Sequence, residues 1–247
     1  MTTLKRLEPD WSVDPKVHAC ITTRQGGYSQ APFHSLNLGS HVNDNPKDVA
    51  KNRAHILQAL QLPARPHWLN QVHGTHVFHA DHHTPEQPVT ADASVSRQPE
   101  TVCAILTADC LPVFFAAVDG SEIGIAHAGW RGLASGILEA TLQAMTTHNS
   151  QIAVWMGPAI GPDAFEVGED VRNAFVTQNA DNMPFFKPNK PGHYHANLYQ
   201  LATLKLNQAG VTKVSGGDHC TYSETKDFFS YRREKETGRM ASLIWIK

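Results

Sequence analysis

Three nearly continuous apolar segments in the middle of this 247-residue chain restrict the folds that it can adopt. They span 101–107, 112–118 and 122–128. A strand with one face in water alternates apolar and polar residues, whereas a strand covered on both faces is apolar throughout. We therefore predict three strands in a sheet with both faces covered. The Asp119-Gly120 pair between the last two segments predicts a hairpin.

Helical patterns and further strands are mixed along the rest of the chain. Asn45 followed by Pro46 predicts a helix start, because asparagine caps a helix and proline suits its first turn. Further helices are expected after Gly132, at 168–178 and at 197–210, further strands at 151–157, 211–217 and 242–247, and loops at 81–90 and 179–193. Hairpin-paired strands with separate helices indicate the α+β fold class.

Nothing in the composition divides the chain or suggests a large partner. No internal repeat or linker appears, so we predict a single domain spanning 1–247. A net charge of −2 gives no field for capturing nucleic acid or an anionic membrane. The first residues lack the apolar run of a secretory signal, and no segment has the ~18 apolar residues of a membrane helix. We expect a cytoplasmic monomer that acts on small molecules.

The 15 histidines make metal binding or acid–base catalysis worth testing. Cys110 lies between two predicted strands, His127 closes the third, and His73 lies where an apolar stretch meets a glycine. Side chains at strand ends converge from distant parts of a chain. Two imidazoles and a thiolate form a suitable zinc site, with a fourth position open to water or substrate, as in catalytic zinc sites.

Spacing alone leaves other interpretations of these residues open. An isolated cysteine is more often a small buried residue, and a strand histidine is more often part of the core. The same side chains also suit a metal-free site, with Cys110 as nucleophile, His127 as base and Asp109 or His73 as the orienting group. The histidine-rich stretch 79–85 has no regular ligand spacing and is interpreted as a surface loop.

Two clusters are suited to binding anions. Arg24 precedes two glycines in 22–27, where backbone N–H groups can hold phosphate or carboxylate. Arg232 and Arg233 lie beside aromatic residues in 229–233 and can clamp an oxyanion or stack on a base. An ordinary turn and a solvated arginine pair explain these patterns equally well. The glycine motifs of dinucleotide and P-loop sites are absent, and so is the motif of zinc nucleobase deaminases.

Three of these segments together resemble motifs of the bacterial laccase-domain family, also called multicopper polyphenol oxidases or purine nucleoside phosphorylases. They read NQVHG (70–74), TADCLP (107–112) and AHAGWRG (126–132). The family includes the enterobacterial peptidoglycan editing factor, and the resemblance extends over essentially the whole chain. It implies a single αββα layered domain with mixed, mostly buried sheets.

The resemblance also implies roles for individual residues. His73, Cys110 and His127 match the family's metal ligands, for zinc first and with copper as an alternative, and they are expected to be catalytic. Arg24, Asn37 and Arg232 match positions near the cleft and are expected to bind substrate.

Several activities are implied by this resemblance. The residues best suit metal-dependent phosphorolysis of purine nucleosides (adenosine, inosine, guanosine or methylthioadenosine), in which arginines hold phosphate; adenosine deamination is also credited to family members. Hydrolytic editing of a UDP-muramoyl-amino acid precursor ranks second. Copper-dependent polyphenol oxidation ranks third, because the histidine motifs are too few for a multicopper cluster. A non-enzymatic zinc-binding protein ranks fourth.

Overall fold

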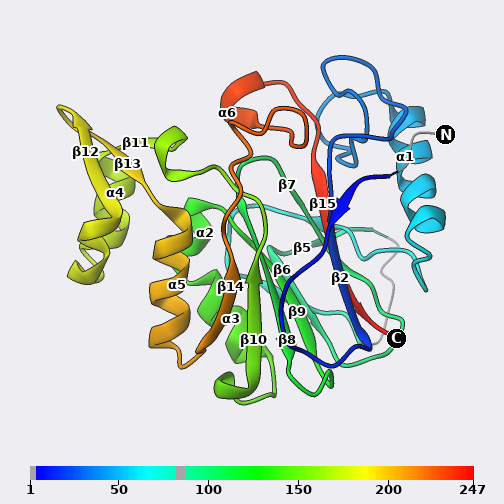
Figure 1. The fold of residues 1–247 in the computed structure, drawn as a ribbon, viewed down its shortest axis with the longest axis horizontal. Helices are drawn as coiled ribbons and strands as arrows, with labels where there is room; N and C mark the ends of the chain where they lie inside the picture. Colours follow the sequence, from blue (N-terminus) through cyan, green and yellow to red (C-terminus); the bar gives the residue numbers. More distant parts are fainter. Residues whose placement is uncertain (1–3, 82–86) are drawn as a thin grey trace.

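Two β-sheets face each other at the centre of the protein in a computed structural model that describes residues 4–81 and 87–247 (Figure 1). The four-stranded sheet has the order β1 (Arg6–Leu7), β2 (Val17–Thr22), β15 (Met240–Ile246), β7 (Cys103–Thr107). The six-stranded sheet has the order β14 (Lys213–Gly216), β10 (Ile152–Met156), β8 (Leu111–Ala117), β9 (Ile123–Ala128), β6 (Ala93–Ser96), β4 (Val77–His79). Side chains from both sheets, such as Phe114 and Ile244, share one apolar core between them.

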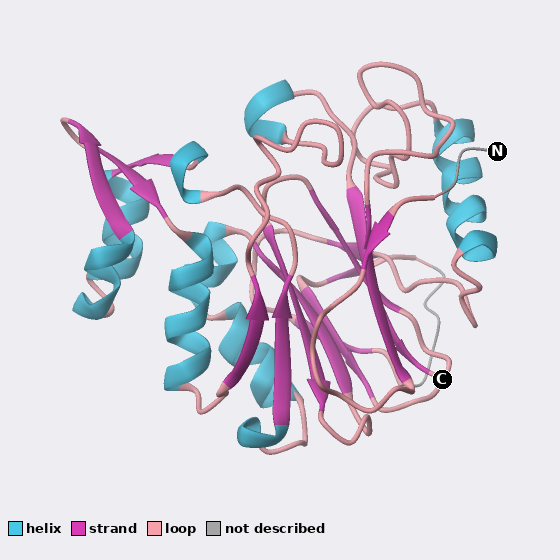
Figure 2. Ribbon diagram, viewed as in Figure 1, coloured by secondary structure: helices cyan, strands magenta, loops and turns pink. Residues whose placement is uncertain are grey.

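Helices cover the outer faces of both sheets, as Figure 2 shows. Helix α1 (Pro46–Ala59) packs on the four-stranded sheet, where Ile56 and Leu243 belong to one apolar cluster. Helices α2 (Trp130–Ser135), α3 (Ile137–Ala144) and α5 (Leu198–Gln208) pack on the six-stranded sheet. The order helix, sheet, sheet, helix confirms the expected α+β fold with αββα layers and mostly buried strands.

Smaller elements complete the structure. A three-stranded sheet has the order β11 (Glu166–Gly168), β13 (His193–Ala196), β12 (Phe186–Lys190), and β3 (Leu69–Asn70) pairs with β5 (Val89–Thr90). Helices α4 (Glu169–Val176) and α6 (Tyr231–Glu234) and short 3-10 turns at 149–151, 162–164 and 180–185 make up the rest. Among the described residues, no helix combines the length and apolarity needed to cross a bilayer.

The three apolar segments form buried strands as predicted, but they divide between the two sheets. Strand β7 lies in the four-stranded sheet, whereas β8 and β9 form the predicted antiparallel hairpin in the six-stranded sheet. Gly120 in the hairpin turn has a φ of 69°. The link from Thr107 to Leu111 therefore crosses from one sheet to the other, and this crossing places Cys110 at the sheet edge next to the segment that leads into β15.

Three sequence-based predictions of local structure were wrong, one of them the loop expected at 81–90, whose last two residues form strand β5. The helix expected after Gly132 starts at Trp130 and is interrupted at Gly136, where a left-handed φ of 99° ends α2 before α3 begins. Part of the loop expected at 179–193 forms the edge strand β12, which pairs with β13. Its polar sequence concealed it, because an exposed edge strand carries no apolar pattern. Most of the loop expected at 79–85 lies outside the described residues.

Candidate metal centre

The three residues that the sequence singled out meet at one edge of the two sheets. One ligand atom from each of His73, Cys110 and His127 lies within 4.8 Å of the others. Sγ of Cys110 lies 3.8 Å from Nε2 of His73, and the two imidazole rings are T-shaped with centroids 4.7 Å apart. The β8–β9 hairpin brings Cys110 and His127 together, because His127 pairs with Pro112, two residues after Cys110.

A buried carboxylate, Asp92, holds both histidines. Nδ1 of His127 donates to Oδ1 of Asp92 across 2.8 Å, and the same carboxylate accepts backbone N–H groups from Val72, His73 and Gly74 at 3.1, 2.9 and 2.7 Å. Asp92 is fully buried and immediately precedes β6, the neighbour of β9. Since Nδ1 of His127 is engaged, Nε2 is the nitrogen left for a metal, an arrangement common among metal-binding histidines.

Two of the residues around the cluster have left-handed backbones. His73 has a φ of 61° and Asp109 a φ of 83°, conformations that cost a non-glycine residue about 1–2 kcal/mol. The hydrogen bonds to Asp92 offset this cost at His73. At Asp109 the carboxylate accepts the Thr221 hydroxyl and the Arg232 backbone N–H, both at 2.6 Å. The C-terminal segment thus holds the turn that presents Cys110.

The electrostatics of the metal-free cluster favour a thiolate beside an imidazolium. Burial opposes the charged form of Cys110, but the positive charge of His127 and hydrogen bonds from both histidines outweigh it and lower the pKa of the thiol to about 6. Burial likewise opposes charge on His127, but the Cys110 and Asp92 charges raise its pKa to about 9. Burial raises the pKa of the Cys20 and Cys103 thiols to about 12. Cys110 alone of these three is prepared for nucleophilic attack or metal binding.

The donor set fits a single zinc ion. Two imidazole nitrogens and one thiolate are usual zinc ligands, and three protein ligands leave a coordination position open. Copper also binds such nitrogen and sulfur donors. Within the described part of the chain, these residues form the single group of three or more histidine, cysteine or acidic side chains close enough to hold an ion. A multicopper centre would require further histidines beside it.

Space around the cluster depends on Gly129, which follows β9. A Cβ atom at this position would lie 2.8 Å from Cδ2 of His73 and 3.0 Å from Sγ of Cys110. The contact with His73 is too short without movement, and the contact with Cys110 is tighter than most Cβ contacts in proteins. The glycine therefore lets the chain pass directly behind two of the candidate ligands.

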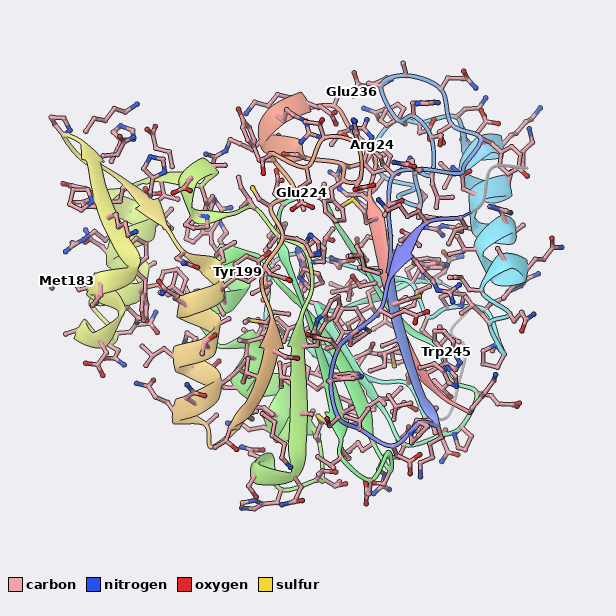
Figure 3. The ribbon with its side chains drawn as sticks, viewed as in Figure 1. Arg24, Met183, Tyr199, Glu224, Glu236 and Trp245 are labelled. Carbon is pink, nitrogen blue, oxygen red and sulfur yellow. The ribbon has the colours of Figure 1, made fainter. Side chains whose placement is uncertain are left out.

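Of the three predicted substrate-binding residues, Arg24 and Asn37 make many contacts within the protein. The Arg24 guanidinium donates to Glu234 at 2.8 Å and lies over the Phe229 ring at 4.7 Å. Figure 3 shows Arg24 and Glu224 at the same end of the molecule. Asn37 is fully buried, and its amide oxygen accepts the backbone N–H of Arg239. Their roles in substrate binding stay predictions.

Arg232 is connected to the metal cluster through Asp109, the residue that precedes Cys110. Its backbone N–H binds the Asp109 carboxylate, and its Nη1 donates to the carbonyl oxygens of Ala164 and Glu166 at 3.4 and 2.9 Å. Its Nε and Nη2 make no hydrogen bond with a described residue, and the guanidinium lies 5.5 Å from the centre of the Phe165 ring. A role for Arg232 in substrate binding stays a prediction.

Sequence reasoning missed Asp92 and Arg239. Asp92 lies about twenty residues after His73 with no motif between them, so only the pairing of β6 with β9 could reveal it. Arg239 is half-buried; burial lowers the pKa of its guanidinium, while the negative charges of Cys110 and Asp109 act in the opposite direction. It therefore supplies positive charge close to the candidate centre.

Comparison with known proteins gives a consistent result across nearly the whole chain. Residues 18–247 match the family model described as multi-copper polyphenol oxidoreductase laccase. A Pseudomonas aeruginosa protein named purine nucleoside phosphorylase PA4543 is 50% identical over 242 residues, which cover 98% of each chain. The Escherichia coli protein named purine nucleoside phosphorylase YfiH is 49% identical, covering 98% of this chain and 99% of its own.

Solved structures support the same grouping. A crystal structure of a Neisseria meningitidis protein assigned to the family DUF152 has a TM-score of 0.95 and 47% identity, covering 98% of this chain and 99% of its own. The structure of a Bacillus licheniformis protein called YfiH has a TM-score of 0.87 and 31% identity, covering 94% and 93%.

We predict that Asp92→Asn weakens zinc binding about 10–100-fold, because the substitution removes the negative charge that orients His127 while keeping the size of the side chain. Competition with a chromophoric chelator measures the affinity. Asp119→Asn, at the opposite end of the β8–β9 hairpin, is the matched control and should bind zinc normally. Equal affinities in the two variants would contradict the role given to Asp92.

We predict that Gly129→Ala loses most zinc binding although all three candidate ligands remain, because the added methyl group must displace His73 or Cys110. Gly74→Ala is the control, since its Cβ would meet nothing nearer than 3.5 Å. Zinc content after dialysis, measured by atomic emission, checks both variants. Normal zinc content in Gly129→Ala would show that the loop can move away.

We predict that Cys110 in metal-free protein reacts with iodoacetamide at a nearly constant rate from pH 8 down to about pH 6.5. The rate should fall below about pH 6, where the thiolate takes up a proton. Cys20 and Cys103 should stay unmodified over this range. Tandem mass spectrometry of tryptic peptides locates the modification, since fragment ions distinguish Cys103 from Cys110, which share the peptide 98–131. A Cys110 rate that rises tenfold per pH unit through pH 8 would contradict the lowered pKa.

Proposed function

This chain belongs to the multi-copper polyphenol oxidoreductase laccase family, and on that premise we propose that it is a metal-dependent purine nucleoside phosphorylase. In this reaction phosphate attacks C1′ of the ribose in adenosine, inosine, guanosine or methylthioadenosine, and the purine base leaves. The observation that carries the proposal is the open His73–Cys110–His127 cluster, in a chain half identical to proteins named purine nucleoside phosphorylases.

His73, Cys110 and His127 would hold one zinc ion. When bound, the ion supplies positive charge that stabilises the negative charge developing on a substrate oxygen. The protein's own contribution is orientation. Asp92 keeps Nε2 of His127 directed at the cluster, and its hydrogen bonds to the 72–74 backbone keep His73 beside it.

Binding of phosphate is assigned to arginines on the C-terminal segment. Arg232 has guanidinium nitrogens beyond Nη1 available, and Asp109 fixes the backbone from which it extends. Arg239 adds a second positive charge near Cys110. Arg24 is held to α6, the helix that contains Arg232, by its ion pair with Glu234. Two guanidinium groups suit a phosphate dianion, and they stabilise it most when it is partly withdrawn from water.

We propose that residues 1–247 form one catalytic domain. The site draws on His73 before β4, on Cys110 and His127 from the β8–β9 hairpin, and on Arg232 and Arg239 before β15. These segments come from both sheets, so neither sheet with its helices carries the proposed site alone.

We predict that zinc-loaded protein converts adenosine and phosphate to adenine and ribose 1-phosphate, and that Cys110→Ala and His73→Ala lose at least about 100-fold of this activity together with their zinc. Chromatography separates adenine, inosine and ribose 1-phosphate, and a parallel reaction without phosphate tests phosphorolysis. Cys103→Ala, which removes a fully buried cysteine away from the cluster, is the matched control and should remain active.

Each competing function gives a different result in the same experiment. Inosine formed without phosphate would indicate adenosine deamination. No change of adenosine, with release of an amino acid from a UDP-muramoyl-amino acid, would indicate precursor editing. Phenol oxidation confined to copper-loaded protein would indicate the polyphenol oxidase. Lost activity with full zinc content in Cys110→Ala would indicate a cysteine nucleophile instead of a ligand.

A further inference from the structure

A cavity of about 520 Å³ lies between helix α1 and the segment that runs from Arg65 to Leu69. None of the residues that line it belongs to the metal cluster or to the arginines assigned to phosphate. Pockets that hold small organic ligands have volumes of about 300–1,000 Å³. The cavity is therefore large enough for a molecule of one or two rings, at a place separate from the proposed catalytic site.

The walls of this cavity are mostly apolar and include flat side chains. Ala54 and Leu57 from α1 line the cavity together with Leu69 of β3, Phe78 of β4 and Val89 of β5. A ligand filling this space must bury an apolar body. A sugar or a phosphate chain would lose hydrogen bonds to water that these walls cannot replace.

One buried polar side chain, His67, lines the cavity; its ring lies 5.9 Å from the Phe78 ring, and it has no hydrogen-bond partner among the described residues. The residue is 9% exposed, and its Nδ1 is enclosed without a hydrogen bond. Burial lowers the pKa of its imidazole, so the ring is neutral and carries one N–H. A buried N–H group without an acceptor costs more free energy than a buried nitrogen lone pair without a donor. Because Nδ1 is the enclosed nitrogen, the proton is favoured on Nε2. Nε2 is then the atom of His67 that can donate a hydrogen bond to a ligand.

The charge around the cavity is positive. Arg53 and Arg65 line it, and no described lining residue is acidic. The Arg53 guanidinium is held in place, because Nε and Nη2 donate to the carbonyl oxygen of Leu38 at 3.0 and 2.8 Å and the group lies 4.3 Å from the Trp68 ring centre. Arg65 is exposed and makes no ion pair or hydrogen bond with another described residue. It is free to pair with an incoming anion.

We propose that this cavity is a binding site for a flat aromatic carboxylic acid. The ring system occupies the apolar space between α1 and Phe78, and the carboxylate accepts hydrogen bonds from Arg65 and His67. The apolar walls select the ring, the two guanidinium groups select the negative charge, and the unpartnered imidazole supplies direction. This site does not depend on the proposed function of the metal centre.

Isothermal titration with naphthalene-2-carboxylate tests the proposal, with naphthalene-2-carboxamide as the neutral molecule of the same shape. We expect saturable one-to-one binding of the acid and binding of the amide weaker by about tenfold, since charge-assisted hydrogen bonds are the stronger ones. Arg65→Gln should weaken binding of the acid several-fold and leave binding of the amide unchanged, since Arg53 keeps its charge beside the cavity. Arg65 is exposed, so this variant should fold normally.

A second pair of variants locates the binding. Ala54→Trp fills the cavity from α1 and should abolish binding of both compounds, whereas Ala59→Trp, on the same helix but outside the cavity, should not. Cys110→Ala should bind the acid normally, which separates this site from the metal centre. Thermal unfolding confirms that each variant is folded. No saturable binding of the acid, equal affinity for acid and amide, or normal binding to Ala54→Trp would overturn the proposal.

Discussion

The buried carboxylate of Asp92 is the interaction on which the candidate site depends. It carries a negative charge inside the protein, which is costly unless hydrogen bonds compensate for it, and four donors do so. Three of these donors are the backbone N–H groups of 72–74, and the fourth is Nδ1 of His127. Asp92 thus stabilises the left-handed backbone of His73 and orients the side chain of His127 in β9. The candidate site therefore depends on Asp92 for the orientation of His127 and for the position of the backbone at His73.

The crossing between the two sheets supplies the third candidate ligand. The chain leaves β7 in one sheet and enters β8 in the other within a few residues, so Cys110 lies at their common edge. Asp109 then binds Thr221 and Arg232, which are more than a hundred residues away in the chain. One proposed metal ligand, Cys110, and one proposed phosphate-binding arginine, Arg232, are connected through this carboxylate, so the position of one restricts the other.

Several elements were predictable because their causes are local. The capping side chain of Asn45 begins α1, and Asp119-Gly120 forms the hairpin turn, since both depend on neighbouring residues alone. The ends of apolar segments suggested His73, Cys110 and His127 as one possible set, and the resemblance of their motifs to a known family made them the expected metal ligands. Other elements depend on distant contacts. The edge strand β12 exists through its pairing with β13, and the break at Gly136 lies inside a continuous helical pattern.

The sequence by itself determined the buried strands, the hairpin and the chemical types of the three candidate ligands, because apolar periodicity and turn residues act over short distances. Tertiary structure alone decided which sheet each strand joins, that Asp92 orients His127, and that Arg24 is engaged with Glu234. It also decided that His67 and Arg65 border an apolar cavity. These outcomes depend on which distant segments pack together, and packing is set by the free energy of the whole core rather than by any one segment.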